Sequence, residues 1–264
     1  MIPLEDNFAD IIAKAQRGLG LADESLAAAA GVTLAELRVV KAERFDERVV
    51  RRLAAPLRLG ADALATRGWL PLPVQVDGLA MFTTQYGGMT VNAFLAHDSR
   101  NAVAFDTGAD VAPMLAFLQK RALKLALVLL THVHDDHVGR LSELRNKTGT
   151  SAFASEREPV PGAETFRDGH VFRVGDLEVE ARRTSGHTRG GTSYVVRGLS
   201  RLVVATGDAL FAGSMGGAAA AYEEALRCNR EQILTLPDEA VICPGHGPMT
   251  TVGEEKRHNP FFSA

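Results

Sequence analysis

One short stretch of the chain, Thr131-His132-Val133-His134-Asp135-Asp136-His137, brings three imidazoles and two carboxylates together. The apolar run 123–130 precedes it and is short enough to be a buried strand. We therefore expect the stretch on a loop at the carboxyl end of a strand, where α/β folds place their sites. In a turn, residues two apart can aim at one point, so His132 and His134 can share one cation. Asp136 and His137 can turn toward a second.

The ligand types indicate which chemistry such a site could do. Imidazole nitrogen and carboxylate oxygen suit Zn, Fe or Mn. Two such ions about 3.5–4 Å apart can hold a bridging hydroxide and polarise a carbonyl. The alternative is a polar surface loop that happens to hold histidines. The chain has only eight histidines in 264 residues, so three within six residues favour the metal site.

Three further polar signals follow predicted strands. His187 lies in Ser185-Gly186-His187-Thr188, after a predicted hairpin, and Asp208 follows the strand 202–206. His246 lies in Pro244-Gly245-His246-Gly247, after the strand 240–243. Small residues beside each of them let the backbone approach a metal closely. Five of the eight histidines thus occur in ligand-like contexts, which favours one site assembled from several strand ends.

The order of these motifs resembles the metallo-β-lactamase superfamily over residues 74–264, with Asp106-Thr107-Gly108 as a fifth motif. The resemblance implies an α/β fold, the four-layer αββα sandwich, with two metal ions between the strand ends of its two sheets. Asp208 would bridge the two ions. Asp106 matches the aspartate that orients the ligand loop. The implied ligands are, for the first ion, His132, His134 and His187, and for the second, Asp136, His137 and His246.

Within the superfamily, segments 207–214 and 244–251 and the tail 253–262 look like the glyoxalase II (hydroxyacylglutathione hydrolase) branch. This likeness implies hydrolysis of a thioester, or of a related ester or lactone, by attack of a metal-bridging hydroxide. Asp136 or Asp208 would assist the proton transfer as the catalytic carboxylate. Enzymes of that branch carry a C-terminal helical domain that helps to bind glutathione. This chain stops soon after its last motif, so the sequence does not decide whether glutathione is the thiol part of the substrate.

Two residues are candidates for contact with the substrate. Tyr86, next to Gly87-Gly88, is expected on a loop before a strand, where such loops border the site in this fold. Its alternative role is to pack on the sheet. Arg189, two residues after His187, could hold a substrate carboxylate. We expect two divalent ions, with Zn the first choice and Fe or Mn as alternatives.

Residues 1–68 are predicted to be wholly helical and to form a separate small domain. Their segment 20–33 resembles the helix-turn-helix of phage-repressor-type DNA-binding domains, which implies a five-helix bundle. A DNA reader needs polar side chains at the start of its second helix to contact base edges, and a basic surface for the phosphates. This segment carries ten Lys/Arg and ten Asp/Glu. Its neutrality argues against nucleic acid and favours a docking or dimerisation module, through which the chain could form a homodimer.

From residue 69 the chain alternates strands and helices, which defines a second, catalytic domain, 69–264. The stretch 69–74 is predicted to be a linker or an edge strand because of its prolines. The other predicted strands are 91–96, 102–105, 123–130, 151–154, 171–174, 177–180, 193–197, 202–206 and 240–243, and the helices are 111–123, 141–146 and 218–236.

Two other functions remain open at this stage. The first is a persulfide dioxygenase, which resembles the same branch and uses one Fe held by two His and one Asp, here among His132 or His134, His187 and Asp208. The second is a DNA-binding regulator whose sandwich senses a metabolite. The net charge of −3 and the absence of a long apolar run argue against a membrane partner. With two cysteines and no signal-peptide pattern, we expect a cytoplasmic protein acting on a small molecule.

Overall fold

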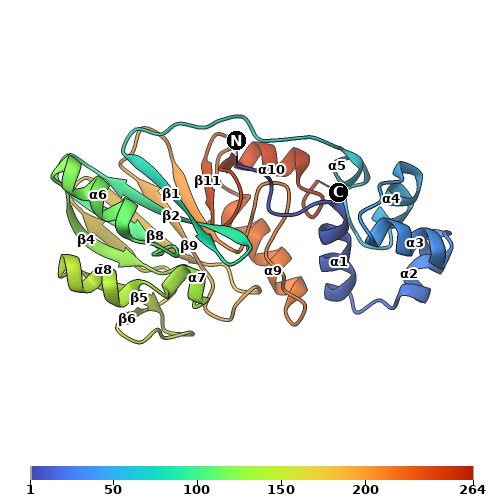
Figure 1. Ribbon diagram of the computed structural model, residues 1–264, viewed down its shortest axis with the longest axis horizontal. Helices are drawn as coiled ribbons and strands as arrows, with labels where there is room; N and C mark the ends of the chain where they lie inside the picture. Colours follow the sequence, from blue (N-terminus) through green and yellow to red (C-terminus); the bar gives the residue numbers. More distant parts are fainter. Residues whose placement is uncertain (1, 264) are drawn as a thin grey trace.

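The computed structural model describes residues 2–263 and consists of a two-sheet sandwich with helices on both outer faces, preceded by five helices (Figure 1). This arrangement confirms the predicted αββα sandwich with a small all-α segment before it. Among residues 2–263, no helix is long and apolar enough to cross a membrane.

The first sheet has the strand order β1-β2-β3-β4-β5-β6. Its first three strands are antiparallel and its last three pairings are parallel. Two of these parallel pairings follow from the crossover helices between β3 and β4 and between β4 and β5, whereas a loop without a helix joins β5 and β6. Its strands are β1 (Leu79–Tyr86), β2 (Met89–His97), β3 (Asn101–Phe105), β4 (Lys124–Leu129), β5 (Ser151–Ser155) and β6 (Glu164–Phe166).

The second sheet has the order β12-β11-β10-β9-β8-β7, and only β10 and β11 pair in parallel. Valines and other apolar residues of both sheets interdigitate between the two layers, where Phe105 and Tyr194 lie 5.6 Å apart between ring centroids. Its strands are β7 (Val171–Val174), β8 (Leu177–Arg183), β9 (Thr192–Arg197), β10 (Val203–Gly207), β11 (Val241–Pro244) and β12 (Thr250–Thr251).

Helices cover the outer face of each sheet. The first sheet packs against α6 (Ala112–Arg121) and α8 (Leu141–Thr148) through a core that includes Met114 and Leu144. The second sheet packs against α9 (Tyr222–Cys228) and its π-helical continuation Asn229–Ile233, and α10 (Val252–His258) follows β12. A single helical turn, α7 (Asp135–Val138), follows β4.

The five N-terminal helices begin and end at residues that the sequence marks. Thr33 and Glu36 form a capping box at the start of α3, and Gly31 ends α2 with φ of 62°, which favours glycine. Asp46 caps α4. The helices are α1 (Phe8–Gly18), α2 (Asp23–Ala30), α3 (Leu34–Lys41), α4 (Glu47–Ala54) and α5 (Ala61–Ala65).

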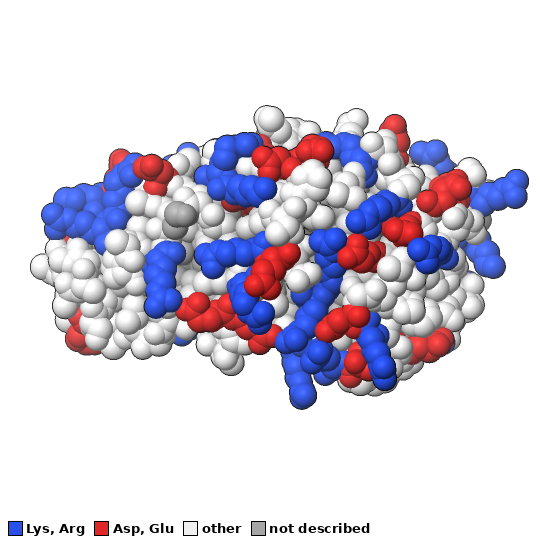
Figure 2. Space-filling model, turned by 180° about the vertical axis from the view of Figure 1, so that it is seen from behind, with Lys and Arg blue, Asp and Glu red and all other residues white. Residues whose placement is uncertain are grey.

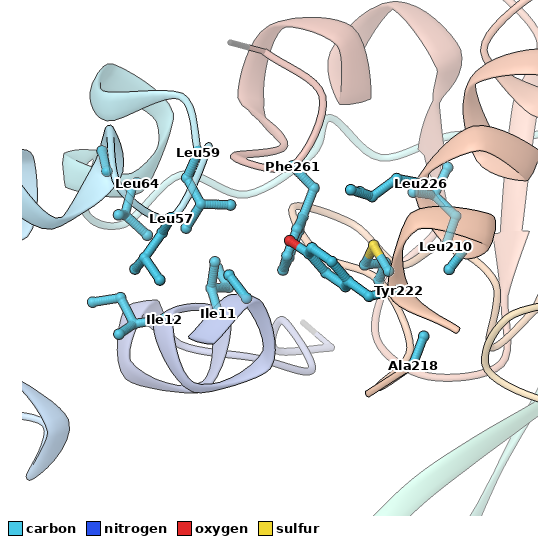
Figure 3. Close-up of a cluster of buried hydrophobic side chains, with 14 of the residues drawn as sticks. Ile11, Ile12, Leu57, Leu59, Leu64, Leu210, Ala218, Tyr222, Leu226 and Phe261 are labelled. Atoms are coloured by element: carbon cyan, nitrogen blue, oxygen red, sulfur yellow. The ribbon is translucent and has the colours of Figure 1, made fainter. Parts of the chain in front are cut away.

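These five helices share one hydrophobic core with the outer layer of the second sheet. Figure 3 shows Ile11 of α1 on one side and Leu226 of α9 on the other, with Phe261 and Tyr222 between them. Gly18 lets α1 approach α9, since a Cβ there would lie 2.3 Å from Tyr222 Cγ. The predicted boundary between domains 1–68 and 69–264 stays a prediction, but apolar packing is continuous across it.

The structure differs from the sequence prediction at several elements. Tyr86 is the last residue of strand β1, not part of a loop, because 79–86 pairs along its whole length with β2. The stretch 69–74 forms no strand. The predicted helix 218–236 begins only at Tyr222 and ends in the π-helical turn. The strands β6 and β12 and the helix α10 were not predicted.

Candidate metal centre

Loops at one edge of the sandwich carry the predicted ligands. His132 and His134 lie between β4 and α7, and Asp136 and His137 lie within α7. The turn is closed by backbone hydrogen bonds from the amides of His137 and Val138 to the carbonyl of His134, at 2.9 and 3.1 Å. His187, Asp208 and His246 follow β8, β10 and β11. Because these strand ends meet at one edge, residues more than 100 positions apart in sequence come together.

The first cluster consists of His132, His134, His187 and Asp208. The Nδ1 of His134 lies 3.1 Å from the Nε2 of His132 and 3.1 Å from the Nε2 of His187. Asp208 Oδ2 lies 3.4 Å from His187 Nε2 and 3.8 Å from His132 Nε2. One ligand atom from each of the four residues lies within 4.8 Å of all the others. Three nitrogens and one oxygen at this separation can surround one ion.

The second cluster consists of Asp136, His137 and His246. Asp136 Oδ2 lies 3.6 Å from His137 Nε2 and 3.3 Å from His246 Nε2. Asp208 reaches this cluster as well, with Oδ1 at 3.3 Å from His137 Nε2 and Oδ2 at 3.5 Å from His246 Nε2. The Asp208 carboxylate is therefore the point at which the two clusters meet.

Two buried polar atoms at this junction test whether a cation fits. His137 Nε2 and Asp208 Oδ1 face one another at 3.3 Å, yet each is buried and has no hydrogen-bond partner. Leaving such groups unpaired costs about 1–3 kcal/mol each. An ion coordinated by both atoms would satisfy them together. The donors present, imidazole nitrogens and carboxylate oxygens, are those that Zn, Fe and Mn accept.

Asp106 holds the ligand loop without offering a free oxygen. Its Oδ2 accepts hydrogen bonds from His137 Nδ1 at 2.8 Å and Thr131 Oγ1 at 2.7 Å, and its Oδ1 accepts one from the Thr131 amide at 2.7 Å. Asp106, His132 and His137 also lie close enough to form a third metal-like group. Since the Asp106 oxygens are already engaged, orientation of His137 is the role that the geometry supports.

Backbone carbonyls fix the rings of two other histidines. His187 Nδ1 lies 2.9 Å from the carbonyl oxygen of Gly217, and His246 Nδ1 lies 2.6 Å from that of Thr90. A carbonyl only accepts, so Nδ1 is the donor in both contacts and Nε2 points into the clusters. Gly245 keeps this arrangement open, because a Cβ there would lie 2.2 Å from Asp208 Oδ1.

Opposite charges within the clusters stabilise each other electrostatically. Burial opposes ionisation of Asp208, but His137 and His246 hold the pKa of its carboxyl well below the usual value. Burial likewise opposes protonation of His137, yet Asp208 and Asp106 raise its pKa to about 10. Burial has the same effect on His246, whose pKa the carboxylates of Asp136 and Asp208 nevertheless raise to about 11. In His132 burial dominates and lowers the pKa.

The structure brings all seven predicted ligands and Asp106 together but leaves the two substrate candidates at the rim. Tyr86 is exposed at the tip of the β1–β2 hairpin, which also provides the Thr90 carbonyl behind His246. Arg189 is exposed, and its amide donates to Glu158 Oε1 at 3.3 Å. No contact within residues 2–263 joins either side chain to the clusters, so their roles stay predictions.

Sequence reasoning missed several residues that support the site. Asn92 is buried in β2 and its Nδ2 donates to the carbonyls of Pro244 and Gly247, at 3.0 and 2.8 Å, which fixes the loop that carries His246. A polar residue within the apolar run 91–96 was the available signal. Glu5 lies 4.0 Å from His246 Nδ1, and nothing in the local sequence indicated that the N-terminal segment reaches the site.

Comparisons with known proteins agree with this geometry. Residues 86–246 match the family model of the metallo-beta-lactamase superfamily. Hydroxyacylglutathione hydrolase GloC of Haemophilus influenzae is 29% identical over 192 residues, which cover 63% of this chain and 90% of that protein. The crystal structure of ETHE1 from Myxococcus xanthus is 30% identical with a TM-score of 0.61, covering 69% of this chain and 83% of that one. TTHA1623, solved in a di-iron-bound form, is 28% identical with a TM-score of 0.57, covering 68% and 99%.

The chain belongs to the metallo-beta-lactamase superfamily, because the family match spans more than half of its residues and includes the predicted ligands from His132 to His246. It is thus a member of a metallo-hydrolase superfamily, and its sandwich carries His and Asp groups that could hold metal ions. Residues 1–85 lie outside the family match.

Proposed function

We propose that this protein is a dinuclear metal-dependent hydrolase that cleaves a thioester or a related ester or lactone. The observation that carries the proposal is the position of Asp208 between two clusters of ligands, with separate contacts from its carboxylate to each. Support for a thioester comes from the relative GloC, whose name describes hydrolysis of hydroxyacylglutathione.

In this proposal each residue has a specific task. His132, His134 and His187 would hold one ion, Asp136, His137 and His246 would hold the second, and Asp208 would serve both. When bound, two divalent ions supply a hydroxide nucleophile at neutral pH and polarise the substrate carbonyl. Burial opposes ionisation of Asp136 at the second cluster, but its hydrogen bond with His246 and the nearby His137 lower its pKa. Its carboxylate is therefore ionised at neutral pH, and together with Asp208 it is the group placed to accept a proton.

Substrate would approach from the side of His134, which is exposed while the other imidazoles of the first cluster are more buried. The exposed Tyr86 and Arg189 flank the site on the hairpin and on the loop after His187. We propose Zn as the resident ion, with Fe or Mn as alternatives, and a small molecule in the cytoplasm as the substrate. The homodimer through residues 1–68 also stays a prediction.

A mononuclear iron oxygenase of the persulfide dioxygenase kind is the second candidate. It is favoured by the first cluster, where two histidines and Asp208 alone could form the two-His, one-carboxylate set of non-haem iron sites. The second cluster favours the hydrolase, because a single iron in the first cluster would leave Asp136, His137 and His246 without a metal ion to bind.

One experiment separates the two candidates. Metal content is measured by mass spectrometry on protein purified without added metal, and the same sample is assayed with a hydroxyacylglutathione thioester and with simple lactones. About two ions per chain together with hydrolysis supports the proposal. One iron per chain, no thioester turnover and oxygen uptake with a persulfide would overturn it in favour of the oxygenase.

A further inference from the structure

We propose that the helical segment before the sandwich positions the metal centre, through a clamp formed by Asp6 and Lys14 on the 213–217 loop. This inference rests on the proposed function, because the loop supports a proposed metal ligand. Lys14 belongs to α1, and Asp6 lies just before that helix. Both residues lie outside the family match, which starts at residue 86, so the clamp comes from the part of the chain that precedes the matched range.

The 213–217 loop is in direct contact with the first cluster. The amide of Gly216 donates to the carbonyl oxygen of Asp208 at 3.0 Å. The carbonyl of Gly217 accepts from His187 Nδ1 at 2.9 Å and so sets the orientation of that ring. There is no spare room, since a Cβ on Gly216 would lie 2.0 Å from the Asp208 carbonyl oxygen and 2.9 Å from His187 Nδ1. A shift of this loop therefore moves a ligand.

The clamp contacts the loop at two consecutive residues, Ser214 and Met215. Lys14 Nζ donates to the Met215 carbonyl at 2.9 Å and forms an ion pair with Asp6. Asp6 Oδ2 in turn accepts from Ser214 Oγ at 2.5 Å. The side chains of Lys14 and Asp6 are only 15% and 9% exposed. Ion pairs sheltered in this way are screened little by solvent, unlike pairs at a free surface.

Lys14 also connects to the second cluster indirectly, through the Phe211 ring. Its Nζ lies 5.2 Å from the centre of the Phe211 ring, and that ring packs edge-on against His246 at 5.7 Å between centroids. The same loop is also held by Asn259, the residue after α10, whose Nδ2 donates to the Ser214 carbonyl at 2.8 Å. The loop is therefore held by both the C-terminal segment and the clamp, and loss of the clamp removes one of these two restraints.

The test measures metal affinity, not turnover. Metal-free protein is titrated with Co²⁺, whose visible absorption reports ligand geometry. Lys14→Met is expected to weaken binding at the first cluster about tenfold, because contacts that orient ligands typically contribute 10- to 100-fold. Lys14→Met alone leaves the sheltered Asp6 charge unpaired, so the double variant Asp6→Asn/Lys14→Met is measured beside it. In this double variant the amide oxygen introduced at position 6 can still accept from Ser214 Oγ. A further variant, Ser214→Ala, removes that contact.

The matched control is Glu223→Gln. It removes the 2.8 Å ion pair between Arg58 and Glu223, which also joins the helical segment to α9 but is exposed and does not touch the 213–217 loop. Its Co²⁺ affinity and spectrum should equal those of the unaltered protein. Lys14→Arg keeps the charge and should restore most of the affinity that Lys14→Met loses.

The outcomes are distinct. Weaker Co²⁺ binding and an altered spectrum in the clamp variants, with Glu223→Gln unaffected, support the inference. Two ions bound with unchanged affinity in all folded clamp variants would overturn it and leave the proposed function standing. A lower melting temperature of the metal-free protein with unchanged Co²⁺ affinity would show a merely structural role and also overturn it. No metal binding by the unaltered protein would overturn both.

Discussion

Asp208 is the residue on which both clusters depend. Its two oxygens contact His137, His187 and His246 at 3.3–3.5 Å. Asp208→Ala removes the shared ligand, so we expect loss of both metal and hydrolytic activity, by more than about 100-fold for the activity. Asp135→Ala is the matched control, since Asp135 is an exposed neighbour in the same turn and belongs to neither cluster. Metal analysis and the thioester assay on the two variants check this. An Asp208→Ala protein that keeps two ions and full turnover would disprove the bridging role.

Metal binding at the second cluster should release protons. The pKa of His137 is about 10 and that of His246 about 11, so both rings are protonated at neutral pH in the metal-free protein. A metal ligand must be a neutral imidazole, so binding displaces about two protons, and the affinity rises with pH across pH 6–8. In the first cluster, burial lowers the pKa of His132 and of His187, so those rings are already neutral.

Calorimetric titration with Zn²⁺ in buffers of different ionisation enthalpy measures this release. We expect one binding phase with little proton release and a second phase with about two protons. The same proton count in both phases, or none in either, would contradict the assignment of charged imidazoles to the second cluster.

At the scale of elements, α10 contains a buried carboxyl group whose effect on stability depends on pH. Glu255 is fully buried, and its oxygens accept from the Gly213 amide at 2.9 Å, Asn259 Nδ2 at 2.8 Å and Thr250 Oγ1 at 2.9 Å. Burial raises its pKa from 4.5 to about 7, against the effect of these hydrogen bonds. The folded state therefore binds the proton more tightly than the unfolded state. This contribution to stability is present at low pH and is lost as pH rises from 4.5 through 7.

Glu255→Gln removes the titration while its amide can still accept from Gly213 and Asn259. Urea unfolding of the metal-free protein at pH 5 and pH 8 gives the difference in unfolding free energy between the unaltered protein and the variant. From pH 5 to pH 8, the unfolding free energy of the unaltered protein should fall by about 2 kcal/mol relative to that of the variant. Equal differences at both pH values would show that Glu255 does not titrate in this range.

The charges of the helical segment bear on its predicted role. In α3 and α4, Arg48 pairs with Glu36, and Lys41 pairs with Asp23. Arg51 contacts both Glu47 and Asp62. Figure 2 shows positive and negative side chains interspersed over most of this face, whereas Lys and Arg side chains gather at its left end, which the helical segment forms. The preference for a docking module over a DNA reader stays a prediction.

Elements with local signals could be predicted from sequence, whereas long-range contacts could not. The capping box of Thr33 and Glu36 and the left-handed Gly31 act over a few residues, so the ends of α2 and α3 were predictable. The site histidines could be recognised from the sequence because several imidazoles and carboxylates that each follow a predicted strand are a rare combination. Strand β1 was missed because its half-exposed residues become a strand only by pairing with β2. The contact from Lys14 to Met215 spans 201 positions and left no local pattern.

At the scale of the whole molecule, the helical segment and the sandwich should unfold together. The segment between α5 and β1 runs along the sandwich, but the main contact is the apolar core shared by α1, α9 and the tail after α10 (Figures 1 and 3). The amide of Gly60 also donates to the Pro260 carbonyl at 2.8 Å. A core shared in this way couples the stability of the two parts, which predicts a single cooperative transition.

Gly18→Ala tests this coupling, because two effects of the substitution have opposite signs. Alanine is favoured over glycine within a helix by at most about 1 kcal/mol, and less at the last residue of α1. The new Cβ would lie 2.3 Å from the Tyr222 ring, and such overpacking costs about 1–3 kcal/mol. The clash should prevail, so unfolding monitored by calorimetry should move to lower temperature by several degrees, or split into two transitions. Gly88→Ala, where a Cβ meets nothing within 4 Å, should leave the curve unchanged. A Gly18→Ala protein that is more stable and still unfolds in one step would show that α1 and α9 are not closely packed.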